Sequence, residues 1–207
     1  MVCLGGPPSA RDLCCGASLT DMDRFMLHLG NDAFVPQDAP RILRWARSLC
    51  SDIDATIRDV RVASKHVEYD VTVAKDMLDD LTGRLEPIGH VSRARHLIEE
   101  KVERDEAIQD GISHFNGERF WEAHESLEGV WKETQGSERI LIQGIILVAA
   151  ALVHHQKNED IICVSIMGRA LEKLAGAGGS YHGIDIDGLK DRVMAIRETK
   201  DVSTFTI

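Results

Sequence analysis

From Val102 to Lys200, hydrophobic residues recur at helical spacing with no run of strand-like alternation. Turn signals divide this half of the chain, among them Asn116-Gly117 and Gln135-Gly136-Ser137. Short links between amphipathic helices favour antiparallel packing. The pattern therefore predicts an all-α helical bundle of about five helices over residues 102–200.

The helices are expected at Ile108–Phe115, Phe120–Glu133, Glu138–Gln156, Ile161–Ala175 and, after a glycine-rich loop, around Leu189–Ile196. Ser137 is the predicted N-cap of the third helix, and Asp185 or Asp187 that of the last. The most apolar stretch, 140–153, is too short to cross a bilayer. It predicts a buried central helix and no membrane association.

A different periodicity governs residues 22–98. Val67, Tyr69, Val71 and Val73 alternate with polar residues, as in a half-buried strand, and 57–63 forms the expected hairpin partner. Further strand and helix patterns complete a small α+β sandwich. Its order is ferredoxin-like βαββαβ if residues 91–97 form a strand, and βαββα if they form a helix. Residues 1–21 are expected to be a disordered tail, and residues 201–207 a second tail.

Composition limits the partners of the chain. The 207 residues carry a formal charge of −10, and no run of Lys or Arg supplies a basic patch, which disfavours nucleic-acid binding. The five cysteines form no CxxC pair. This is typical of a reduced, cytoplasmic chain and not of a disulfide framework.

Several polar residues are expected at the surface. His66, Glu68 and Asp70 fall on the side of their strand that faces away from the hydrophobic residues, so we expect them to face solvent. Five further histidines have no partner at a useful spacing and are also assigned to the surface: His28, His90, His96, His114 and His182.

The helix expected at Phe120–Glu133 carries the candidate site. On a helical wheel centred on His124, Phe120 and Trp131 lie within about 40° of it, and Glu128 lies one turn further along. Glu125 falls on the flank, at about 100°. The remaining positions predict a polar outer face: Glu122, Ser126, Gly129 and Lys132. Polar groups stranded in an apolar stripe need partners, because each costs roughly 1–3 kcal/mol when unpaired.

The third helix offers such partners. Gln143 and His154 are three turns apart and share one of its faces. If the two helices pack antiparallel, these side chains can converge with His124 and Glu128 in the bundle core.

Three interpretations of this centre stay open. His124, Glu128 and His154 could bind zinc or a similar divalent ion, with Glu125 as a general base. The likeness to HExxH enzymes is partial, since Glu128 replaces the second histidine. Alternatively, a metal-free His–Glu pair could bind or transform a small molecule. Finally, His124 and Glu128 could form a hydrogen-bond network that only fixes helix packing.

The run from Phe120 to Trp131, with its AHExLExxW core after Phe115-Asn116, resembles a family catalogued as domain of unknown function number 309. The further matches are Arg139, Gln143-Gly144, Ala149-Ala150, a histidine at 154 or 155, and Asn158. The resemblance covers roughly residues 102–200 and implies a small helical bundle centred on the His-Glu helix, with no established reaction. The expected site-lining residues are Trp121, Trp131, Gln143 and Arg139. Ile161-Ile162 and the position of Gly117 depart from the family pattern, which affects the loops and not the central helix.

Two classes of function follow. The first is a metal-assisted or acid–base hydrolase that acts on a small substrate. The second is a non-catalytic structural or ligand-binding module, which would form a homo-oligomer through an edge strand or bind a regulatory ligand.

Overall fold

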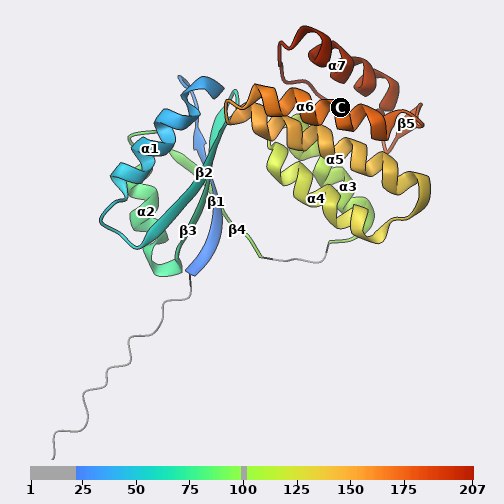
Figure 1. Ribbon diagram of the computed structural model, residues 1–207. Coiled ribbons are helices and arrows are strands. Elements are labelled where there is room, and N and C mark those ends of the chain that lie inside the picture. Colours follow the sequence, from blue (N-terminus) through green and yellow to red (C-terminus); the bar gives the residue numbers. More distant parts are fainter. Residues whose placement is uncertain (1–21, 99–101) are drawn as a thin grey trace, which may run out of the picture.

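The computed structural model describes residues 22–98 and 102–207 (Figure 1). The predicted tail at residues 1–21 lies outside the described residues. The fold class expected from the sequence is confirmed: a four-stranded antiparallel sheet with helices is followed by a region of five helices.

The first unit has the order βαββαβ. Its strands are β1 (Met22–Gly30), β2 (Ala55–Val62), β3 (His66–Ala74) and β4 (Val91–His96). They form one antiparallel sheet in the order β2-β3-β1-β4. The ambiguous segment 91–97 therefore contains a strand, β4, which pairs with β1 at the edge of the sheet.

Two helices cover one face of this sheet (Figure 1): α1 (Ala39–Leu49) and α2 (Leu78–Leu85). Short 3-10 turns precede them, η1 (Pro36–Asp38) and η2 (Lys75–Met77). The alternating hydrophobic residues of β3, for example Val67 and Tyr69, are fully buried in this core. The Tyr69 hydroxyl donates to the Ile42 carbonyl of α1 at 3.1 Å, so the core tyrosine is satisfied.

The second unit is the helical bundle. It contains α3 (Arg104–Asn116), α4 (Phe120–Glu133), α5 (Gly136–Gln156), α6 (Asp160–Leu174) and α7 (Ile186–Thr199), with a two-residue hairpin formed by β5 (Ser180–Tyr181) and β6 (Ile184–Asp185). Residues 201–207 form no regular element, yet Phe205 packs against Phe115 of α3.

Helix α5 is the central helix of the bundle. It packs against both α4 and α6 and is mostly apolar on the faces that they cover. Within the described residues it alone is long and apolar enough to cross a membrane, but its place between two other helices is that of a core helix. The prediction of a buried central helix is therefore confirmed.

One predicted helix end was wrong. Ser137 is not the N-cap of α5, because the helix begins at Gly136, whose positive φ of 65° makes the turn out of α4. The Asp185 cap of α7 is confirmed: its carboxylate accepts from the Gly188 amide at 3.0 Å.

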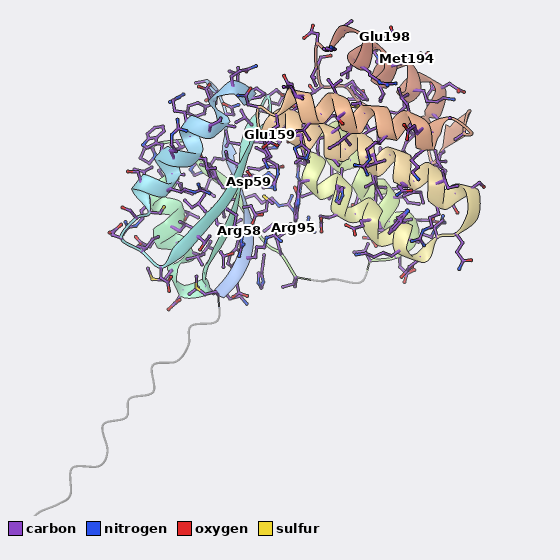
Figure 2. The ribbon with its side chains drawn as sticks, viewed as in Figure 1. Arg58, Asp59, Arg95, Glu159, Met194 and Glu198 are labelled. Atoms are coloured by element: carbon purple, nitrogen blue, oxygen red, sulfur yellow. The ribbon has the colours of Figure 1, made fainter. Side chains whose placement is uncertain are left out.

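The bundle covers the sheet face opposite α1 and α2 (Figure 1). Figure 2 shows Asp59 of β2 and Arg95 of β4 on the sheet, where it meets the bundle. Lys157 Nζ, after α5, lies 2.9 Å from Asp59 Oδ2, and Glu118 Oε2, before α4, accepts from the Ser64 amide at 2.6 Å. We call this contact region the seam.

Candidate functional site

Helix α4 turns a different face toward the bundle core than the sequence predicted. Its buried bundle face consists of Phe120, Ala123, Leu127 and Val130. The middle of that face lies about 80° around the helix from His124. The predicted stripe omitted Ala123 and Val130, and this rotated it toward the histidine. The expectation of a core-buried His124 was wrong: its side chain is 29% exposed.

Three of the predicted site residues nevertheless come together. His124 Nδ1 lies 3.4 Å from Glu125 Oε1 and 3.8 Å from Glu128 Oε2, and one donor atom of each residue lies within 4.8 Å of the others. Glu125 and Glu128 are 49% and 35% exposed. The Nδ1 atom itself is shielded from solvent and has no hydrogen-bond partner in the described part of the chain. We call these three residues the α4 cluster.

The acidity of Glu125 reflects this arrangement. The pKa of the Glu125 carboxyl is lowered, and its contact with His124 is the largest cause. Burial acts in the opposite direction and raises this pKa, while the positive charge of Arg24 lowers it further. Glu125 therefore stays a carboxylate at neutral pH. A carboxylate of lowered pKa is a weak proton acceptor, because a general base works best when its pKa lies near the working pH. It is well suited to bind a cation.

His154 is not part of the α4 cluster. Its Nδ1 lies 2.5 Å from Glu159 Oε2, just before α6, while the neighbouring His155 Nδ1 lies 2.7 Å from Asp160 Oδ1. Both histidines thus pair with carboxylates at the α5–α6 turn. Gln143, the other expected partner, is half-buried in α5.

The other expected lining residues are placed at the two ends of α4. The Arg139 guanidinium stacks 3.9 Å from the centre of the Trp131 ring and donates to the Thr134 carbonyl at 3.1 Å. At the opposite end, Trp121 receives the guanidinium groups of Arg24 and Arg61 from the sheet, at 5.5 and 5.4 Å. Trp121 is therefore part of the seam.

Glu122, which the wheel placed on the polar outer face, is wholly buried at the seam. Arg95 Nη1 of β4 donates to its Oε1 at 2.7 Å, and Arg119 donates from both Nε and Nη2. His28 Nε2 of β1 lies 3.2 Å from its Oε2. Burial alone would raise the pKa of Glu122, but the contacts with His28, Arg119 and Arg95 outweigh it and hold the pKa far below its usual range. The outer-face assignment of Glu122 was wrong because the sheet, not solvent, covers that side of α4.

The polar face of the sheet was misassigned for the same reason. Glu68 and Asp70 are buried, and His66 is half-buried. His28, also expected at the surface, is 5% exposed. Asp70 accepts from Arg24 Nε and Nη2 at 2.9 and 2.6 Å. One sequence signal could have indicated that the bundle covers this face of the sheet: acidic, basic and histidine side chains occupy the same face of neighbouring strands.

Comparison with known proteins agrees with the family resemblance of the sequence over part of the predicted range 102–200. No curated protein matches the chain. Residues 108–166, from α3 into α6, match the model of one family, described as Domain of unknown function (DUF309), and this segment includes the whole of helix α4.

Proposed function

We propose that this protein binds a divalent metal ion through the α4 cluster and uses it to hydrolyse a small substrate. The observation that carries the proposal is that Glu125 and Glu128 both approach Nδ1 of His124, an imidazole nitrogen that is shielded from solvent. Ligands at 2.0–2.1 Å from a tetrahedral ion lie about 3.3 Å from one another. The separations of 3.4 and 3.8 Å from His124 Nδ1 are close to that value.

The sequence predicted His154 as the third ligand, beside His124 and Glu128. In this proposal Glu125 takes that place. One imidazole and two carboxylates form a mixed donor set that suits zinc and similar divalent ions. Since Glu125 and Glu128 are partly exposed, an ion held there would keep positions open for water and substrate, as hydrolytic metal sites do. A metal-bound water ionises near pH 7, so the reaction would not require Glu125 as a separate base.

We also infer a cytoplasmic location and a ferredoxin-like first unit. The strand order and the antiparallel pairing of β1 to β4 support the second inference. Cys50 and Cys163, buried as free thiols, are compatible with a reducing compartment.

The test is zinc and manganese binding to the purified full-length chain, measured by equilibrium dialysis after treatment with a chelator. The double variant His124→Asn/Glu128→Gln is expected to lose one equivalent of metal. Glu133→Gln, an exposed carboxylate on the same helix, is the matched control and should bind as the parent does. Equal binding by the double variant and the parent would overturn the proposal.

The runner-up is a non-catalytic module in which the helical bundle serves as a scaffold. The ion pairs of the seam favour it, since Arg95, Arg119 and His28 all meet at Glu122. Under this alternative the α4 cluster would bind no metal. The double variant would then change only the thermal stability.

A further inference from the structure

A second group of metal-type side chains lies inside the seam, away from the α4 cluster. It consists of His28 on β1 and of His66 and Glu68 on β3. The antiparallel register places His28 directly opposite Glu68, while His66 is opposite Gly30, two positions along. Residues two apart on a strand share a face, so all three side chains point toward the bundle. We call them the sheet cluster.

The sheet cluster is buried and poorly satisfied. Glu68 is 0% exposed and His28 is 5% exposed. Considering residues 22–98 and 102–207, no hydrogen-bond partner reaches His66 Nε2, His28 Nε2 or either oxygen of Glu68. Buried polar groups without partners cost roughly 1–3 kcal/mol each, and a native fold seldom keeps several in one place.

The donor atoms have the spacing of ligands around one ion. His66 Nε2 lies 3.4 Å from Glu68 Oε1, and His28 Nδ1 lies 4.0 Å from the same oxygen. The first value is close to the separation of about 3.3 Å for neighbouring ligands of tetrahedral zinc, and the second would shorten as the ion draws in the His28 ring. Two imidazoles and one carboxylate favour zinc-type ions over magnesium or calcium, which prefer oxygen donors throughout.

The surrounding side chains match the outer partners of a metal site. Histidine ligands commonly direct their second nitrogen to a carboxylate, which orients the ring. Here the second nitrogen of His28, Nε2, lies 3.2 Å from Glu122 Oε2 on α4, although it is not aligned for a hydrogen bond. The two oxygens of Glu68 also have different neighbours. Oε1 lies near the two histidines, while Oε2 lies 3.6 Å from Arg61 Nη1. The positive charge of Arg61 is thus directed at the oxygen that the ion would not use.

We propose that the sheet cluster is a buried zinc-type site with a structural role. The ion binds His28, His66 and Glu68 and thereby joins β1 to β3. Through the contact between His28 and Glu122 it also fixes α4 against the sheet. This site is independent of the proposed hydrolytic centre, since the two share no ligand.

The competing explanation is a metal-free ion cluster, in which a protonated histidine lies between Glu68 and Glu122. Zinc binding distinguishes the two. The experiment uses the full chain in the His124→Asn/Glu128→Gln background, so that the α4 cluster does not contribute. After chelator treatment, one equivalent of zinc is expected to bind and to raise Tm.

The variants Glu68→Gln and His66→Asn each remove one ligand. Loss of an outer partner weakens metal affinity 10–100-fold, so loss of a direct ligand should weaken it by more than about a hundredfold. The matched control is His90→Asn, which alters the exposed His90–Glu86 pair of the same unit and should leave zinc binding unchanged. Unchanged zinc affinity in folded Glu68→Gln or His66→Asn protein would overturn the proposal.

If Glu68→Gln or His66→Asn does not fold, a spectroscopic measurement on the His124→Asn/Glu128→Gln background protein still tests the proposal. Cobalt in place of zinc, bound by the three side chains and one water, should give the visible absorption of a four-coordinate site with nitrogen and oxygen ligands. If the background protein gives no such absorption and zinc does not raise its Tm, the sheet cluster is metal-free and the proposal fails.

Discussion

Arg95 Nη1 donates to Glu122 Oε1 at 2.7 Å, and this bond joins the edge strand β4 to the helix that carries the candidate site. Arg119 holds the same carboxylate from within the bundle. Glu122 is therefore a wholly buried carboxylate held by two guanidinium groups.

Replacing Glu122 by glutamine should destabilise the protein strongly. The change leaves two guanidinium groups without their counter-charge, and breaking a buried pair in this way costs about 3–5 kcal/mol. We expect about 3 kcal/mol, the low end of that range, because Arg95 is partly exposed. Urea unfolding measures the effect. Glu133→Gln, exposed at the end of α4, should change stability by less than about 0.5 kcal/mol, and equal effects of the two changes would contradict the role given to Glu122.

The same carboxylate predicts how stability depends on pH. The pKa of Glu122 is lowered in the folded state, so its contribution is complete above the unfolded value of 4.5 and is lost as the pH falls below it. Within that acidic range one such group changes the free energy of unfolding by about 1.4 kcal/mol per pH unit. The stability gap between wild type and Glu122→Gln should therefore narrow from pH 6 to pH 3. A gap that stays constant over this range would mean that Glu122 is not the titrating group.

The order of elements was predictable because the spacing of hydrophobic residues that marks a strand or a helix is visible within a short stretch of sequence. The strand spacing is uninterrupted in β3, at Val67, Tyr69, Val71 and Val73, and the helix spacing recurs throughout the bundle. Residues 91–96 remained ambiguous since β4 is an edge strand with a largely exposed, polar sequence. Its strand conformation depends on pairing with β1, which is more than sixty residues away.

The site was only partly predictable, because it depends on what covers each surface. Alternation shows that Glu68 points away from the hydrophobic core, but not that a bundle lies on that side. The wheel brought His124 and Glu128 close together, since an i, i+4 spacing is local. It could not place Glu122, whose partners Arg95 and His28 belong to the other unit.

Cys163 should be unreactive in the native protein. It is fully buried in α6, and burial raises the pKa of its thiol to about 12. Since the thiolate is the reactive form, iodoacetamide at pH 8 should leave Cys163 unmodified in the folded chain. Peptide mass spectrometry measures this, with the guanidinium-unfolded protein as the positive control. Equal modification of Cys163 in the folded and unfolded protein would show that α6 does not seal it.

A close helix contact can be tested with two glycines. A Cβ added to Gly144 of α5 would lie 2.6 Å from both Cγ and Cδ2 of Leu174 on α6, which is too short for a carbon contact. Overpacking costs about 1–3 kcal/mol, and the better helix propensity of alanine offsets about 1 kcal/mol of that. For Gly144→Ala we expect a net loss of up to about 2 kcal/mol in the free energy of unfolding.

Gly129 in α4 is the matched control, since its added Cβ meets no described atom within 4 Å. Gly129→Ala should raise the free energy of unfolding by up to about 1 kcal/mol, because only helix propensity changes there. The two substitutions are chemically identical, so their opposite signs would isolate the α5–α6 contact. If Gly144→Ala also stabilised the chain, α5 and α6 would have to lie farther apart than the Leu174 contact requires.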